Sequence, residues 1–122
     1  MELKSETIEF RDGTKLTVTE ANWPADVKVS EMEREAENNP RKDNQRQFYA
    51  MAVYPKLAAC STGDIPTEEQ AFLMPSAEHD KWYNAAARVN PNWFDPLEKA
   101  AKQLSTEAMK KKEKKRTKST KG

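Results

Sequence analysis

The sequence has little of the chemistry that enzymes and metal sites use. Among its 122 residues there is one cysteine, Cys60, one histidine, His79, and only three glycines. A single cysteine excludes an intrachain disulfide and a thiolate metal cluster. The paired side chains of most metal sites and nucleophile–base arrangements are missing as well. Three glycines leave no room for a glycine-rich phosphate-binding motif. We therefore expect no catalytic residue, no metal site and no cofactor.

Neither Cys60 nor His79 has a neighbour in the sequence that would make it reactive. No second histidine stands at a helical spacing from His79, so a solvated histidine in the first turn of a helix is favoured over a ligand or a general base. Cys60 has no histidine near it in sequence, and a free cysteine is usually a small buried apolar residue. We expect a solvated His79 and a buried Cys60, neither of them catalytic.

Long apolar runs are also missing. Hydrophobic residues make up 36% of the chain and charged residues 34%, and the mean hydropathy is −1.02. No run approaches the roughly 18 apolar residues of a membrane span, and Met1-Glu2-Leu3-Lys4 does not resemble a signal peptide. We expect a cytoplasmic protein without membrane contact, whose folded part is shorter than the chain.

The basic residues are concentrated at the end of the chain. Residues 110–122 hold eight basic residues and one acidic residue, which leaves 13 basic and 19 acidic residues in 1–109. The tail is interpreted as a disordered, solubilising end; the alternative is contact with nucleic acid or another polyanion by counterion release. The side chains that would make this polyanion contact are Lys110, Lys111, Lys112, Lys114, Lys115 and Arg116.

The N-terminal residues predict a β-hairpin. Residues 7–10 and 15–19 alternate between apolar and polar side chains, and Asp12-Gly13 lies between them. Asp-Gly between two alternating runs is a strong hairpin signal, because glycine accepts the positive φ of the turn. The apolar members share one face and need a helix to cover them; they are Ile8, Phe10, Leu16 and Val18.

Helices are predicted for most of the middle of the chain. After Trp23-Pro24 breaks the strand pattern, residues 32–38 predict a helix with Ser30 as its N-cap. Residues 44–60 predict the main core helix, which Pro55 should kink or interrupt. Residues 61–64 are expected to end it, with Gly63 after the last helical residue.

Two further helices and a last one complete the prediction. Thr67, with Gln70 three residues later, predicts a capped helix to Leu73 or Met74. Ser76 is expected to cap a helix to about Val89, with an apolar stripe that contains Trp82. Residues 97–109 predict the last helix. The fold class is therefore α+β and mainly helical: a hairpin (1–22), a helical core domain (23–96), a C-terminal helix (97–109) and a basic disordered tail (110–122).

The aromatic residues are the best candidates for a binding surface. Trp82 follows the apolar stripe of its helix, which favours the core. Trp93 and Phe94 lie between two prolines in a predicted connector, where they either fill the core or anchor a partner. A working hypothesis is that Tyr54, Leu57, Trp82, Trp93 and Phe94 border a groove that binds a helix.

Residues 49–94 resemble the tail assembly chaperones of long-tailed bacteriophages. The resemblance rests on turn and helix-packing residues, and the preceding hairpin also suits that family. The matching segments are Tyr54-Pro55-Lys56-Leu57-Ala58-Ala59-Cys60-Ser61-Thr62-Gly63, Ile65-Pro66-Thr67-Glu68-Glu69, Lys81-Trp82-Tyr83, Ala85-Ala86, Val89-Asn90-Pro91 and Trp93-Phe94.

The resemblance implies a non-catalytic protein that binds other proteins. Such chaperones coat the tape measure protein, keep it soluble and recruit the tail tube subunit, and a longer form arises by ribosomal frameshifting. The lysine run at 110–112 is compatible with a slippery codon stretch. Self-association is possible. The alternative function is a nucleic-acid-binding accessory protein that uses the lysine-rich tail.

Overall fold

The computed structural model describes residues 1–94. Within them, residues 1–91 form one compact unit, so the hairpin and the helices that follow it belong together, and residues 92–94 belong to a second unit. The predicted last helix (97–109) and the basic tail (110–122) lie outside the described residues.

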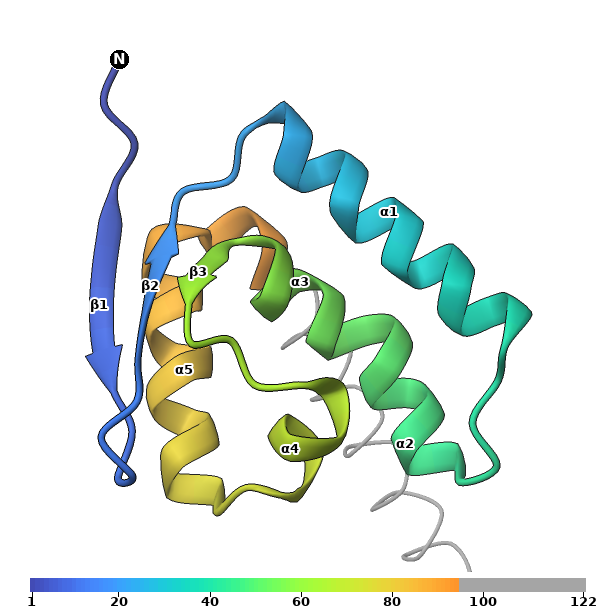
Figure 1. The fold of residues 1–122 in the computed structure, drawn as a ribbon. Helices are drawn as coiled ribbons and strands as arrows, with labels where there is room; N and C mark the ends of the chain where they lie inside the picture. Colours follow the sequence, from blue (N-terminus) through green and yellow to red (C-terminus); the bar gives the residue numbers. More distant parts are fainter. Residues whose placement is uncertain (95–122) are drawn as a thin grey trace, which may run out of the picture. The chain divides into compact units, whose positions relative to one another are not determined.

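A three-stranded antiparallel sheet opens the fold. Its strands are β1 (Ser5–Glu9), β2 (Lys15–Thr19) and β3 (Ser61–Gly63), in that order across the sheet (Figure 1). Ile8 pairs with Leu16, and Leu16 and Val18 are almost fully buried. The predicted hairpin and its apolar face are therefore confirmed.

The hairpin turn is a three-residue loop. The Phe10 N–H donates to the Thr14 carbonyl at 2.8 Å, and the Gly13 N–H donates to the Phe10 carbonyl at 2.9 Å. Gly13 has a φ of +90°. A three-residue hairpin loop commonly places a residue with positive φ at this point, so the glycine is required by the backbone.

Strand β3 was not predicted, because residues 61–64 were interpreted only as the end of a helix. β3 pairs with β2, with Ser61 opposite Val18 and Gly63 opposite Leu16. Gly63 has a φ of +99°, and a Cβ there would lie 3.0 Å from the Lys15 carbonyl oxygen. The glycine therefore allows β3 to approach β2, rather than ending a helix.

Helix α1 (Trp23–Asn38) begins nine residues before the predicted start at Met32. The side chain of Asn22, not Ser30, caps it by accepting a hydrogen bond from the Ala25 N–H at 3.1 Å. Pro24 lies in the first turn, where its missing N–H has no helical partner to lose. The proline that was expected to break the chain pattern thus starts a helix.

The predicted core helix at 44–60 is divided into three parts. It consists of α2 (Asn44–Phe48), a π-helical turn η1 (Tyr49–Val53) and α3 (Tyr54–Ala59). Pro55 lies in the first turn of α3. The interruption predicted at this proline is confirmed, and the wider turn before it avoids the contact that its ring would make with an ordinary α-helical turn.

Helices α4 (Glu68–Leu73) and α5 (Ser76–Val89) follow the predictions closely. Helix α4 has the capping box of Thr67 and Gln70. Helix α5 begins after Pro75, which takes the N-cap position expected for Ser76. At its end the Asn90 side chain accepts from the Ala21 N–H at 2.7 Å and donates to the Thr19 carbonyl at 3.1 Å.

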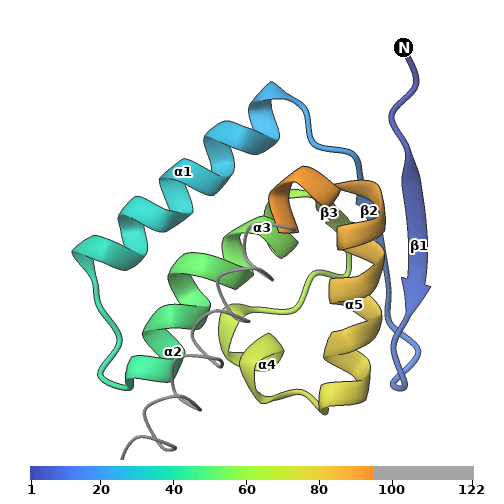
Figure 2. The same ribbon diagram turned by 180° about the vertical axis from the view of Figure 1, so that it is seen from behind.

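Helix α5 provides the main covering of the sheet. Its predicted apolar stripe is buried, with Trp82, Ala85 and Ala86 fully inaccessible and Val89 nearly so. Helix α1 lies along α3 and η1, on the side away from the strands, as both ribbon views show (Figures 1 and 2). The α+β, mainly helical class is confirmed.

Candidate partner-binding surface

Three of the residues assigned to the hypothetical helix-binding groove belong to the core. Leu57 and Trp82 are fully buried and Tyr54 is 9% exposed. The Trp82 Nε1–H donates to the Ser61 hydroxyl at 2.9 Å, which in turn donates to the Leu57 carbonyl at 2.6 Å. The Tyr54 hydroxyl donates to the Pro66 carbonyl at 2.5 Å. Their polar atoms are satisfied internally, so these side chains border no open groove.

The other two groove residues lie in a helical turn and not in an extended connector. Residues 91–94 are helical. The side chain of Trp93 is half-buried and that of Phe94 is fully buried. Phe94 is therefore not an open anchor for a partner.

An apolar pair on α1 is exposed instead. Trp23 is 78% exposed and Val27 is 39% exposed. Four residues apart on one helix, they are neighbours on the same face. The opposite face of α1 packs on α3 and η1 and contains the buried Ala36. We name Trp23 and Val27 the α1 apolar pair. Adjacent exposed apolar side chains, unlike single scattered ones, form the kind of patch at which partners bind.

Four other large apolar side chains in the described residues are exposed: Met1 and Leu3 before β1, and two on helices. Phe48 at the end of α2 is 52% exposed, and Leu73 at the end of α4 is 69% exposed. Each lies in the last position of a short helix. Single exposed apolar residues are common on protein surfaces, so these two serve as comparisons for the α1 apolar pair.

His79 is not the solvated residue that the sequence predicted. Its ring is half-buried, and its Nε2 lies 2.7 Å from the Tyr49 hydroxyl. The rings of Tyr49 and Trp82 lie 5.5 and 6.4 Å from the imidazole. Burial lowers the pKa of His79, outweighing the opposite effect of Asp80, and burial also raises the pKa of Tyr49. Both groups are therefore uncharged members of an aromatic cluster at neutral pH.

Cys60 follows the sequence prediction. The thiol is 5% exposed and donates weakly to the Leu57 carbonyl at 3.5 Å. Burial raises its pKa to about 11. Because the thiolate is the nucleophile, this thiol is unreactive at neutral pH.

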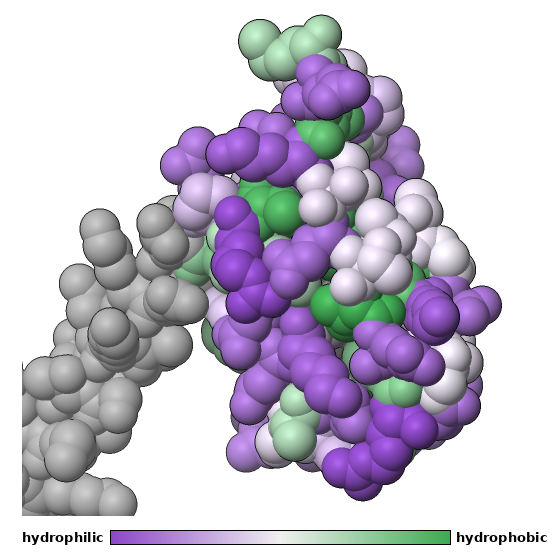
Figure 3. Space-filling view, turned by 90° about the vertical axis from the view of Figure 1, so that its left-hand side faces the viewer, coloured by the Kyte–Doolittle hydropathy of each residue, from purple (hydrophilic) through white to green (hydrophobic). Residues whose placement is uncertain are grey.

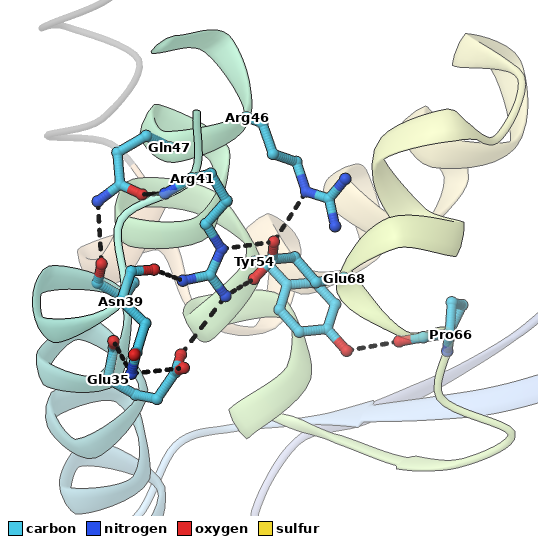
Figure 4. Close-up of polar contacts among 9 residues, drawn as sticks. Glu35, Asn39, Arg41, Arg46, Gln47, Tyr54, Pro66 and Glu68 are labelled. Atoms are coloured by element: carbon cyan, nitrogen blue, oxygen red, sulfur yellow. Dashed lines mark hydrogen bonds and ion pairs between the residues drawn. The ribbon is translucent and has the colours of Figure 1, made fainter. Parts of the chain in front are cut away.

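Glu68 is the centre of the main polar cluster of the described residues (Figure 4). Arg41 donates to both of its oxygens, at 3.1 Å from Nε and 2.7 Å from Nη2. Arg46 donates from Nε at 2.8 Å. Burial by itself would raise the pKa of Glu68, but the hydrogen bonds from Arg46 and Arg41 outweigh it and lower the pKa. The Glu68 cluster (Glu68, Arg41 and Arg46) joins α4 to α2 and to the loop after α1.

Two shallow hollows lie on the unit formed by residues 1–91. One of about 650 Å³ lies between the hairpin turn and the start of α5, with Phe10, Met74 and Glu78 in its lining. The other, of about 470 Å³, lies between β1 and α5 and is lined by Ile8, Glu9, Ala77, Asp80, Lys81, Asn84 and Arg88. Neither brings together an acid, a base and a nucleophile in the arrangement that catalysis uses.

Residues 1–94 contain no group of three or more histidine, cysteine, aspartate or glutamate side chains arranged to hold a metal ion. No helix among them has the length and apolar character needed to cross a membrane. The six basic residues proposed for polyanion contact, Lys110, Lys111, Lys112, Lys114, Lys115 and Arg116, lie outside the described residues.

Comparison with known proteins gave no match: no family model, no curated protein and no solved structure is significantly similar to this chain. The candidate surface is therefore argued from the structure of this chain alone. Sequence reasoning missed Trp23 because Trp23-Pro24 was interpreted only as a break in the strand pattern. The available signal was Asn22 before Trp23-Pro24, which together form an N-cap and a first helical turn.

Proposed function

We propose that this protein is a non-catalytic, protein-binding chaperone of phage tail assembly, and that it contacts its client through the α1 apolar pair. The observation that carries the proposal is the 78% exposure of Trp23, with Val27 one turn further along the same face. Tryptophan is among the residues that most often dominate binding energy at protein interfaces.

A helix docks on a partner through apolar anchors spaced three, four and seven residues apart. Trp23 and Val27 have such a spacing on α1, so α1 would pack with this face against an apolar stripe of a helical client. The tape measure protein of a long tail is such a helical client, and the resemblance of residues 49–94 to tail assembly chaperones motivates this choice. Recruitment of the tail tube subunit belongs to the same proposal.

Co-expression tests this function. A tape measure protein that aggregates when expressed alone is expected to be recovered in the soluble fraction, bound to this chain, when the two are expressed together. Failure to increase the soluble fraction would contradict the proposal. A helical protein of similar length and composition, unrelated to phage tails, is the specificity control and should stay insoluble.

Deleting residues 110–122 separates this function from nucleic-acid binding. The truncated chain should keep the client soluble, because the α1 apolar pair is unchanged. If the chain instead retains nucleic acid on purification, loses it steeply as salt is added and no longer binds it after the deletion, the alternative function is correct.

A further inference from the structure

One edge of the sheet is open among the described residues. Strand order β1-β2-β3 leaves β1 with a neighbour on one side only. At its two ends the Glu20 N–H donates to the Lys4 carbonyl at 2.7 Å and the Phe10 N–H to the Thr14 carbonyl at 2.8 Å. Because hydrogen-bonded positions alternate in an antiparallel pair, the even-numbered residues of β1 bond to β2. The N–H and C=O groups of Ser5, Thr7 and Glu9 therefore point to the open edge.

This edge lacks two of the features that prevent strands from pairing, a proline and a bulge, although Glu6 and Glu9 place two charges on it. β1 has five residues, and none is a proline. Its pairing with β2 runs without interruption from Ser5 to Glu9, so no bulge twists the edge away. Proteins usually protect an exposed edge by such devices, because its unpaired backbone groups are a template for another strand. Figure 3, which views the molecule from the β1 side, shows a mainly hydrophilic surface with small apolar areas.

We propose that β1 pairs with β1 of a second copy of this chain, antiparallel and about a twofold axis at Thr7. The odd-numbered groups bond only in registers that place odd residues opposite odd residues. Among these, the register with Thr7 opposite Thr7 and Ser5 opposite Glu9 is the one that overlaps the two five-residue strands completely. The two three-stranded sheets then form one continuous sheet of six strands. Isologous pairing of this kind is the usual form of a C2 dimer.

The side chains are compatible with this register. On the outer face the Thr7 and Thr17 hydroxyls already lie 2.8 Å apart, and the twofold axis extends this threonine row into the second copy. Glu9 faces Ser5 of the second copy, so no two like charges stand directly opposite each other.

The inner face is compatible for a different reason. Glu6 faces Ile8 of the second copy, and its carboxylate is already ion-paired with Arg88 of its own α5, so no unpaired charge is introduced. Ile8 is half-buried and lines the hollow between β1 and α5. An added strand removes part of its exposed surface from water.

A symmetric disulfide tests the register. In a hydrogen-bonded antiparallel pair the two Cα atoms lie about 5.5 Å apart, within the range that a disulfide spans. Thr7→Cys should therefore form a covalent dimer of the full chain under mild oxidation. Thr17→Cys is the matched control on the same face: the two positions are three strand spacings apart in the dimer, about 14 Å, and should not cross-link. The native Cys60 is buried and stays outside the reaction.

The dissociation constant of the full chain, measured by sedimentation, provides the second test. Ser5→Lys places an ammonium opposite Glu9 of the second copy and should tighten the dimer roughly two- to thirty-fold over its two symmetric pairs, whereas Ser5→Glu should weaken it by a similar factor. Thr7→Pro removes an open-edge N–H without touching the bonds to β2 and should abolish the dimer, while Thr7→Ala should keep it.

Three results would overturn the inference. The first is a chain that stays monomeric at every concentration, which is also the outcome if a strand of another protein occupies the edge. The second is equal cross-linking of Thr7→Cys and Thr17→Cys. The third is a dimer whose dissociation constant is the same in the wild type and in both Ser5 variants. These measurements use the chain alone, so they can fail independently of the proposed chaperone function.

Discussion

Replacing Glu68 by glutamine should destabilise the fold. The carboxylate accepts three hydrogen bonds from two guanidinium groups. Its side chain is 17% exposed, and those of Arg41 and Arg46 are 23% and 25% exposed. The glutamine keeps the shape but leaves Arg46 without this counter-charge, and leaves Arg41 with only the longer contact to Glu35 at 3.4 Å.

The expected loss follows from these contacts. Hydrogen bonds to charged groups contribute about 1.5–3 kcal/mol each, but glutamine retains one acceptor oxygen and the cluster is in part solvated. We expect Glu68→Gln to lower the free energy of unfolding by about 2–3 kcal/mol. In urea this should move the midpoint by on the order of 1–2 M with an unchanged m-value.

The matched control is Glu6→Gln. It removes one exposed partner of the Glu6–Arg88 ion pair, in which the side chains are 35% and 58% exposed. Exposed ion pairs contribute little, so this variant should unfold close to the wild type. Equal midpoints for the Glu68 and Glu6 variants would refute the claim that the Glu68 cluster holds α4 to α2.

The pH dependence gives a second readout of the same cluster. The pKa of Glu68 is lowered in the fold from its ordinary value of 4.5. The unfolded chain therefore binds the proton first as the pH falls. The stabilisation is present above pH 4.5 and is lost as the pH falls through the lower folded pKa. In Glu68→Gln the free energy of unfolding should therefore change less with pH below pH 4.5 than in the wild type.

Three further predictions concern the core. The lowered pKa of His79 means that stability is present above its ordinary pKa of 6.5 and decreases as the pH falls below it; His79→Gln should remove that decrease in thermal melts between pH 7 and pH 5. Cys60, with its pKa raised to about 11, should react with a thiol reagent only after unfolding, and a rate independent of denaturant would contradict its burial. Trp82→Phe loses the bond to Ser61 and leaves a small cavity, so it should cost about 2 kcal/mol in urea unfolding.

The elements that the sequence predicted well are those specified by local chemistry. The hairpin follows from alternation and from Gly13, and α4 follows from the capping box of Thr67 and Gln70. In each case the residues that determine the element lie within a few positions of one another. Local signals of this kind need no knowledge of the tertiary structure.

The elements that the sequence did not predict depend on contacts between distant residues, or on a residue type that is compatible with two different structures. Strand β3 has three polar or small residues and exists because β2 lies beside it. Pro24 ends one pattern and starts another, since proline disrupts a strand but suits the first turn of a helix.

The exposure of the tryptophan residues could not be predicted from the sequence for a related reason. Trp23 and Trp82 are the same residue type, one 78% exposed and the other fully buried. Periodicity placed Trp82 on a buried face, because α5 has a clear apolar stripe. It gave no information on Trp23, whose helix was expected to begin nine residues later. The exposure of each aromatic side chain therefore depends on the tertiary structure and could not be read from the sequence.

The most direct test of the central claim is a pull-down of co-expressed tape measure protein with three forms of the full chain. These are the wild type, the Trp23→Ala/Val27→Ala double variant and Leu73→Ala, the last a matched loss of an exposed apolar side chain on another helix. Both substituted surfaces are exposed, so all three forms should fold alike. We predict that the double variant recovers at least about tenfold less client and that Leu73→Ala recovers as much as the wild type. Full recovery by the double variant would contradict the account.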